Sequence, residues 1–325
     1  MPQINPRAAM TAIAISSLIG LCADAADAQS TYPSRPVTLV LTQGPGSQAD
    51  LLARVLAEQM GKSLQQTFII DNRAGASGTI GVSAVKRAAP DGYTLGYGSQ
   101  GAFSIQPHLH KSMPYDVADF DFVCQTNIIN LVVVAGPKSP FHSMKELVDA
   151  ARNAPDTITL GSVGVGSGPH LIGEAIALEA GVKFNHIPFS KIGDLNTQLM
   201  AGNIDFTVTT PTLIAGNKAV RPLAAIASQK LTSNPDVPLL QDLGFKRTPL
   251  PGFIGMYAPK GIPAEALTRL SQTCADAVKS DAYRTASEGT SSPVQYADPA
   301  QYALTVKQDV GQMGELIRAL GIKPE

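Results

Sequence analysis

The sequence predicts an α/β fold in two units, because short apolar runs typical of strands alternate with amphipathic helical patterns along most of the chain. Several of these runs end in glycine-containing turns that open directly into a helical pattern, which is typical of parallel sheets covered by helices. The length of 325 residues also favours two domains over one.

The first part of the chain alternates strand and helix. Strands are expected at 37–41, 68–70 and 93–97, with a second helix around 80–88. Gly61 marks the expected end of the first helix. The apolar face of that helix is formed by Leu51, Leu52, Val55, Leu56 and Met60.

The rest of the chain continues in this style and then becomes helical. Ser143 and Glu146 have the spacing of a capping box, and Pro263 and Pro299 stand where helices are expected to begin. No internal repeat is evident. Further strands are expected at 131–135, 157–160, 184–187, 204–208, 223–227 and 253–257, and helices at 170–180 and 195–200 and over the stripe Tyr302, Val306, Val310, Met313, Ile317 and Leu320.

The N-terminus predicts export. Arg7 precedes an apolar run at 12–23 that is too short to span a bilayer, and Ala26-Asp27-Ala28 fits a signal-peptidase site. We therefore expect residues 1–28 to be a cleaved signal peptide and the mature protein to reside in the periplasm.

The charge balance excludes some partners. The chain has 25 Lys and Arg against 26 Asp and Glu, and the signal peptide contains one Arg and two Asp, so the net charge changes from −1 to zero on cleavage. A neutral chain without a basic tract argues against nucleic acid as a partner. A bound anion must therefore be held by local groups.

Two cysteines, Cys124 and Cys274, would remain after cleavage. Export permits a disulfide, but both residues fall in apolar patterns, which favours two separate buried thiols. No cysteine spacing indicates a metal site.

The turn from Gly44 to Ala49 matches the dinucleotide pattern G-x-G-x-x-[GA], and Asp71 follows at a suitable distance. Export and the stiff Pro45 argue against a dinucleotide, so an exported oxidoreductase that uses this loop for a dinucleotide is the second-ranked function. The alternative is that the helix N-terminus binds a carboxylate. Ser47 is expected either to cap this helix or to contact a ligand, and Asp50 to complete a capping box.

A second glycine-rich loop at 161–170 also leads from a strand into a helix, and it lacks the lysine of a nucleotide-triphosphate loop. His170 is interpreted as a helix-start residue held by hydrogen bonds. Arg73 is expected to tie its loop to its own domain, although it could clamp a carboxylate. Ser99 and Gln100 follow a strand at its carboxyl end, where ligands of α/β sheets usually lie.

Catalytic patterns are scarce. No G-x-S-x-G elbow or H-E-x-x-H motif occurs, and His108 and His110 have no acidic partner at metal-ligand spacing. Asp119 and Asp121 are interpreted as solvated turn residues. The sequence therefore predicts neither an enzyme nor a cofactor or metal site.

Taken together, these segments resemble the Bug/TctC family, the periplasmic substrate-binding proteins of tripartite tricarboxylate transporters. No single motif is unique, but the set occurs in family order over nearly the whole mature chain. The matching stretches are 32–37, Asp71-Asn72-Arg73 with Gly75 and Gly78, 89–95, Met113-Pro114-Tyr115-Asp116, Gly161-Ser162 through His170-Leu171, 199–205 and Tyr257-Ala258-Pro259.

The resemblance implies a type II periplasmic-binding fold: two α/β domains, a hinge and a ligand cleft between them. Domain 1 would comprise residues 29–128 and 250–325, and domain 2 residues 129–249. Two loops, 43–48 and 164–170, would hold a small carboxylate largely through backbone N–H groups. The expected ligand-binding residues are Gln43, Gly44, Gly46, Ser47, Gln48, Ser99, Gln100, Gly164, Val165, Gly166, Ser167, Gly168, His170, Phe189, Ser190, Thr209 and Phe253.

Several of these positions depart from the family pattern. Gln48 adds bulk to the first loop, Val165 and Pro169 replace polar residues in the second, and Thr209 replaces a common aspartate. The loss of polar groups predicts a less hydroxylated ligand, and the loss of the acid disfavours an amino acid, whose ammonium would lack a partner.

The expected ligand is thus an aliphatic or aromatic carboxylate or dicarboxylate. The expected protein partner is a two-subunit membrane permease, or alternatively a membrane sensor, and the protein itself is expected to be a monomer.

Overall fold

The computed structural model describes residues 32–215, 217–246 and 252–324. The predicted signal peptide lies outside these residues. Within the described part of the chain, no helix combines the length and apolar character that crossing a membrane requires.

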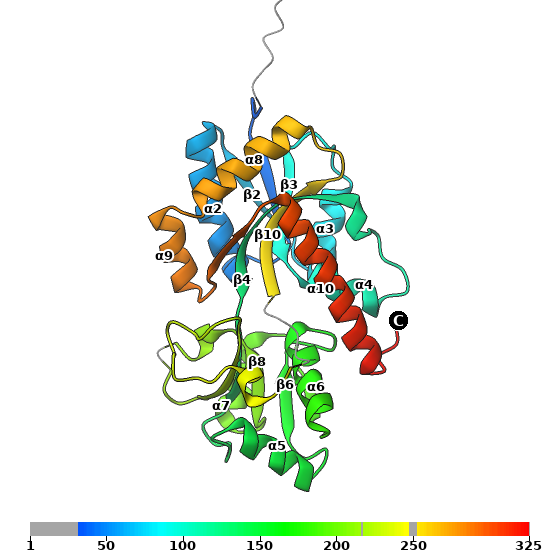
Figure 1. The fold of residues 1–325 in the computed structure, drawn as a ribbon, viewed down its shortest axis with the longest axis vertical. Helices are drawn as coiled ribbons and strands as arrows, with labels where there is room; N and C mark the ends of the chain where they lie inside the picture. The colour runs from blue at the N-terminus through cyan, green and yellow to red at the C-terminus, as the bar shows by residue number, and fades with distance from the viewer. Residues whose placement is uncertain (1–31, 216, 247–251, 325) are drawn as a thin grey trace, which may run out of the picture.

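The chain builds two mixed sheets, and Figure 1 shows them one above the other. The upper sheet has six strands in the order β11-β4-β10-β3-β1-β2, in which β1 runs parallel to β2 and β3. We call this sheet with its helices the six-stranded lobe. Its elements are β1 (Val37–Leu41), α2 (Gln48–Leu64), β2 (Phe68–Asn72), η1 (Ala76–Gly78), α3 (Thr79–Lys86), β3 (Thr94–Ser99), η2 (Gly101–Ile105), α4 (Gln106–Leu109), η3 (Val117–Asp119), β4 (Phe120–Ile129), β10 (Gly252–Pro259), α8 (Ala264–Ala277), α9 (Asp281–Gly289), β11 (Val294–Ala297) and α10 (Pro299–Ala319).

The lower sheet has five strands in the order β7-β6-β8-β5-β9, in which β6 runs parallel to β7 and β8. We call it with its helices the five-stranded lobe. Its elements are β5 (Leu131–Ala135), α5 (Met144–Asn153), β6 (Thr159–Ser162), α6 (Gly168–Ala180), β7 (Asn185–Pro188), α7 (Ile192–Ala201), β8 (Phe206–Thr209), η4 (Pro211–Leu213), β9 (Arg221–Ile226) and η5 (Leu240–Leu243).

Each lobe has an apolar core on both faces of its sheet. In the six-stranded lobe, one face is covered by α2, α8 and α9, and the other by α3, η2 and α10. In the five-stranded lobe, α5 and α6 cover one face and α7 the other. The expected strands and helices are thus confirmed as elements, with boundaries shifted by a few residues.

The structure of the first helix, α2, differs from two expectations. Leu51 is 47% exposed, although its spacing placed it with the buried Leu52 and Leu56. The helix also continues past Gly61 to Leu64. A Cβ at Gly61 would lie 2.8 Å from the carbonyl oxygen of Gln66, so this glycine allows the chain to fold back against the helix instead of ending it.

The expectation of two free thiols is wrong. Cys124 on β4 and Cys274 on α8 are both fully buried, as predicted, but they form a disulfide. Helix α8 lies against β4 across the sheet face, which brings together residues separated by 150 positions. Local apolar patterns predict burial, but they carry no information on this adjacency.

The interpretation of Asp121 as a solvated turn residue is also wrong. Asp121 lies within β4, and its carboxylate accepts hydrogen bonds from the Lys260 ammonium at 2.7 Å and from the Gly261 N–H at 2.7 Å. Burial alone would raise the pKa of Asp121, but these bonds outweigh burial and lower it. The residue thus fixes the turn after β10.

The lobes are joined where β4 ends and β5 begins, and they also touch through side chains. Ile105 of η2 and Met313 and Ile317 of α10 pack in one buried cluster with Leu171 and Ala175 of α6. Figure 1 shows the lower end of α10 reaching toward α6. The beginning of α6, which follows the second glycine-rich loop, therefore lies at the junction of the two lobes.

Candidate functional site

The carboxyl ends of the parallel strands in the six-stranded lobe bring three loops together. The Asn72 side-chain amide donates a hydrogen bond to the Gln43 carbonyl oxygen at 3.0 Å. A Cβ at Gly78 would lie 3.2 Å from Thr42 Cβ and 3.3 Å from Ala102 Cβ. The loops after β1, β2 and β3 are therefore in contact at one edge of the sheet, as expected for parallel strands.

The first loop is a tight turn held by its own helix. The Ser47 N–H donates to the Gly44 carbonyl oxygen at 3.2 Å, and Ser47 Oγ accepts the Asp50 N–H at 3.2 Å. The Gly46 N–H donates to Asp50 Oδ2 at 2.9 Å. Gly46 has a φ of +77°, which favours glycine. Ser47 thus caps α2, while Asp50 holds Gly46 instead of completing the expected box with Ser47.

The second loop has the same construction. The Ser167 N–H donates to the Gly164 carbonyl oxygen at 3.3 Å, and Ser167 Oγ accepts the His170 N–H at 3.4 Å. The Gly166 N–H donates to His170 Nδ1 at 3.1 Å, and Gly166 has a φ of +73°. His170 is therefore a helix-start residue held by hydrogen bonds, as predicted.

The two loops form a short internal repeat that the sequence analysis missed. Residues 44–50 and 164–170 share Gly-x-Gly-Ser-x-x and then a side-chain acceptor, Asp50 or His170. The capping serines have nearly equal backbone angles, φ −69° and ψ 161° for Ser47 and φ −70° and ψ 155° for Ser167. The spacing is visible in the sequence, but its structural role becomes clear only from the hydrogen bonds that these residues form.

Open space lies beside both loops. A Cβ added at Gly46, Gly164 or Gly168 would meet no atom within 4 Å. The first N–H groups of a helix have no partner inside the helix, and the helix dipole makes this end electropositive. The N-termini of α2 and α6 therefore offer N–H donors and open space, which together suit an anion.

Asp50 is the electrostatic centre of the first loop. Its side chain is only 3% exposed, and Arg54 donates two hydrogen bonds to it at 3.0 Å each. Burial alone would raise the pKa of Asp50, but bonds from Arg54, the Gly46 N–H and Asn72 outweigh burial and lower it. The carboxylate is thus ionised and compensated, so it need not repel a bound anion strongly.

Replacing Asp50 with alanine is expected to lower the free energy of unfolding by about 1–3 kcal/mol at neutral pH, because the Gly46 N–H and Asn72 lose a buried acceptor. The folded-state pKa is lowered, so this stabilisation is present above the unfolded pKa of about 4 and is lost as pH falls through the folded value. Urea unfolding at several pH values measures it. The control Asp149→Ala removes an exposed partner of Lys145 and Arg152 and should change stability by about 0.5 kcal/mol or less. An equal loss in both variants would contradict the assigned role.

The second loop is supported by a histidine pair instead of an ion pair. The rings of His170 and His186 stack with centroids 3.9 Å apart, and His186 Nε2 lies 2.7 Å from Ser162 Oγ. Burial, with a smaller contribution from His186, lowers the pKa of His170 to about 4. His170 is therefore neutral near pH 7, and its Nδ1 can accept the Gly166 N–H.

The other predicted site residues lie in different surroundings. Ser99 ends β3, and the Gln100 amide donates to Asp309 Oδ1 at 2.7 Å. Thr209 is buried at the end of β8. Phe253 is 2% exposed and packs against Tyr302 in the core, so little of its ring can reach a ligand in this conformation.

Four further predicted residues lie in the two loops or just after β7. Val165 is 73% exposed at the tip of its loop. Phe189 follows β7, and its N–H donates to the Ser162 carbonyl oxygen at 2.8 Å, which places the neighbouring Ser190 beside the same strand ends. The Gln48 amide donates to the Thr290 carbonyl oxygen at 2.7 Å, so this side chain joins α2 to the end of α9.

Residues with other proposed roles also have defined partners. Arg73 pairs with Asp71, two residues earlier near the end of β2, at 2.7 Å, which is a contact within its own lobe. His108 and His110 bond separately, to the Val310 carbonyl oxygen and to Gln106. Among the residues that the structure describes, no group of three or more His, Cys, Asp or Glu is placed to hold a metal.

Comparison with known proteins places this architecture in a family. Residues 52–322 match the model of TctC, the tripartite tricarboxylate transporter family receptor. BugT of Bordetella pertussis is 30% identical over 300 residues, which cover 90% of this chain and 91% of BugT.

Solved structures agree over the same extent. The periplasmic binding protein BugD superposes with a TM-score of 0.78 at 28% identity, covering 90% of this chain and 100% of BugD. Rpa4515 of R. palustris, solved with adipate, gives a TM-score of 0.80 at 27% identity, covering 90% of this chain and 100% of Rpa4515. These matches confirm the type II periplasmic-binding fold and exclude the dinucleotide oxidoreductase as a description of the chain. The chain belongs to the TctC/Bug family of non-enzymatic periplasmic solute-binding proteins.

Proposed function

We propose that the protein captures a small organic carboxylate between its two lobes for uptake by a tripartite tricarboxylate-type transporter. The repeated loop carries the proposal: each lobe supplies one Gly-x-Gly-Ser turn at a helix N-terminus, with open space beside its glycines. An anion between the two turns would meet N–H donors from both lobes. The adipate bound to Rpa4515, a relative of the same fold, supports a carboxylate as the ligand class.

The side chains around the loops favour an aliphatic or aromatic carboxylate over a hydroxylated one. Val165 exposes most of its surface at the tip of the second loop, and the half-buried Phe189 follows β7, which pairs with β6, the strand that leads into that loop. Thr209 offers a hydroxyl but no charge to an ammonium group. An amino acid would therefore bury its ammonium without an acidic partner at this position, which is unfavourable.

The proposed mechanism is closure of the lobes around the ligand. The carboxylate first meets the 43–48 loop, and the 164–170 loop then contacts its other side. Closure removes water from the N–H groups, which strengthens their hydrogen bonds to the anion. In this scheme residues 29–128 and 250–325 move as one domain and residues 129–249 as the other. The closed protein would then dock as a monomer on a two-subunit permease.

A thermal-shift screen tests the ligand class. The protein without residues 1–28 would be screened against linear dicarboxylates, aromatic carboxylates, citrate, amino acids and NAD. At a hundred times its dissociation constant, a ligand should stabilise the protein by about 2.7 kcal/mol and raise its melting temperature by several degrees.

The denatured protein should be checked by mass spectrometry for a ligand retained during purification. A shift with aliphatic or aromatic carboxylates, or such a retained compound, supports the proposal. Tightest binding of citrate or an amino acid contradicts the predicted ligand class. Co-purification with a membrane kinase instead of a permease would favour the sensor alternative.

A further inference from the structure

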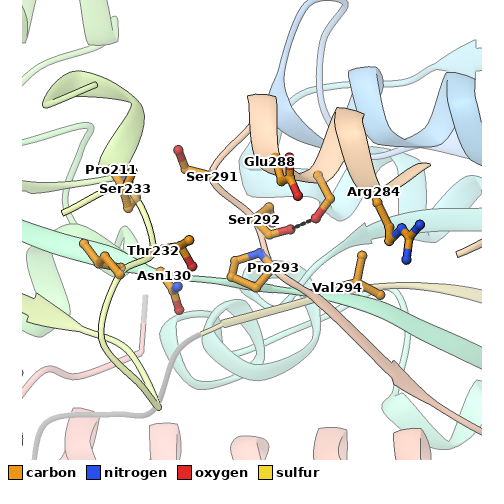
Figure 2. A pocket seen from close by; sticks show the side chains of 12 residues that line it. Asn130, Pro211, Thr232, Ser233, Arg284, Glu288, Ser291, Ser292, Pro293 and Val294 are labelled. Carbon is orange, nitrogen blue, oxygen red and sulfur yellow. Dashed lines mark hydrogen bonds between the residues drawn. The ribbon is translucent and has the colours of Figure 1, made fainter. Parts of the chain in front are cut away.

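A cavity of about 440 Å³ lies between the lobes beneath α9, outside the two loops (Figure 2). We call it the α9 cavity. Its volume is in the range of pockets that hold small organic molecules and exceeds the space that one water or ion needs. It is lined by Asn130, Pro211, Leu231, Thr232, Ser233, Arg284, Ser287, Glu288, Ser291, Ser292, Pro293 and Val294.

Both lobes contribute to this cavity. Asn130 stands between β4 and β5, where the chain passes from one sheet to the other. Pro211 and the 231–233 segment come from the five-stranded lobe, and the 284–294 segment from the six-stranded lobe. In Figure 2, Pro211 and Ser233 lie across the cavity from Glu288 and Arg284. A molecule in the cavity would therefore contact both lobes at once.

In each lobe, a short stretch of chain links the α9 cavity to a predicted ligand contact. Gln48 of the first loop donates its amide hydrogen to the Thr290 carbonyl oxygen, and the next residue, Ser291, lines the cavity. In the other lobe, Thr209 ends β8 and Pro211, two residues on, lines the cavity. The cavity therefore begins at residues adjacent to predicted ligand contacts in each lobe.

The lining is suited to an apolar group. Pro211, Leu231, Pro293 and Val294 supply hydrocarbon surface, and Val294 is 37% exposed. The hydroxyls of Ser287 and Ser292 donate to backbone carbonyl oxygens, which leaves less of their hydrogen-bonding capacity for a ligand.

The charged side chains that line the cavity, Arg284 and Glu288, are exposed, which places them at its rim. They are of opposite sign, and Arg284 is paired with Asp281. The cavity thus offers a mainly apolar surface, with the unpaired side-chain oxygen of Asn130 as a polar group, and no strong net charge.

We infer that the α9 cavity receives the apolar body of the ligand, an aliphatic chain or a ring, while its carboxylate is held at the two loops. The inference rests on the proposed function and adds a preference for ligand size. Short carboxylates would fill only the space at the loops. Longer ones would also bury hydrocarbon against Leu231, Pro293 and Val294, so affinity should rise with chain length.

Two series of ligands and one filling variant test the inference. Dissociation constants would be measured by calorimetry for butanoate, hexanoate and octanoate, and for succinate, adipate and suberate. In Val294→Trp, the larger side chain occupies part of the cavity from an exposed position on an edge strand, where folding should tolerate it. If the tryptophan keeps two or more methylenes of the ligand out of the cavity, binding of the longest ligand should weaken by about tenfold or more. Binding of the shortest should change by about twofold or less.

Two matched controls accompany the filling variant. Val294→Ala enlarges the cavity, and Leu304→Trp adds the same side chain at an exposed site on α10 that does not line it. Both should retain the wild-type order of affinities. If Val294→Trp binds every ligand as the wild type does, or if affinity does not rise with length, the inference fails while the carboxylate function stands. If no carboxylate of either series binds the wild type, the proposed function fails and the inference with it.

Discussion

Replacing Cys124 and Cys274 together with alanine is expected to lower the free energy of unfolding by about 2–5 kcal/mol. The disulfide links residues 150 positions apart, and a cross-link over so long a loop removes much conformational freedom from the unfolded chain. The chain-entropy model gives about 5 kcal/mol for such a loop, which is an upper value because the unfolded chain retains some structure. Urea unfolding of the oxidised wild type and the double variant measures the difference.

Reduction provides a second route to the same quantity. Wild-type protein unfolded with a reductant should show a lower urea midpoint than oxidised protein, whereas the double alanine variant should not respond. Thiol titration of the non-reduced, denatured protein without residues 1–28 should detect no free thiol. Two free thiols there, or a midpoint that ignores the reductant, would show that the cysteines are not joined.

The disulfide illustrates what local patterns cannot predict. Cys274 lies on an apolar helical stripe and Cys124 in an apolar strand, so burial followed from the sequence alone. Their pairing depends on α8 crossing the face of the sheet over β4. That crossing is fixed by the strand order, in which β4 lies between β10 and β11, elements formed more than a hundred residues later.

The parts of the fold that depend only on local sequence could be predicted. The glycine turns at 44–46 and 164–166 are local features found where they were expected, and Ser47 caps α2, one of the two roles expected for it. The exposure of Leu51 was not predictable in this way. Periodicity places it with Leu52 and Val55, but the buried stripe of α2 runs through Leu52 and Leu56, and Leu51 lies outside it on the exposed side with Arg54 and Glu58.

The candidate site was predictable as two loops but not as a network. Asn72 and His186 support the loops through hydrogen bonds and ring stacking, and neither was predicted as a site residue. The repeated spacing of Gly, Gly, Ser and an acceptor was the available signal. This spacing also explains why one loop has Asp50 and the other His170. The position requires only a side chain that accepts a hydrogen bond from a glycine N–H, and a carboxylate and a buried neutral histidine both do so.

Replacing Gly166 with alanine is expected to weaken binding of the carboxylate ligand by about tenfold or more, since a left-handed backbone costs a residue with a Cβ about 1–2 kcal/mol. Gly166 has a φ of +73°, and a Cβ there would lie only 2.3 Å from Leu109 Cδ1 of the other lobe. To relieve this contact, either the conformation of the 164–170 loop or the distance between the lobes must change. Both changes would displace N–H donors from the anion. Gly311→Ala on α10 is the matched control, because its added Cβ meets nothing within 4 Å and the residue is not a predicted ligand contact, and it should bind within about threefold of wild type. Calorimetry with the ligand that binds most tightly in the screen measures the dissociation constants of the wild type and both variants. Equal affinities of the two variants would show that the left-handed turn of the second loop does not form the anion site.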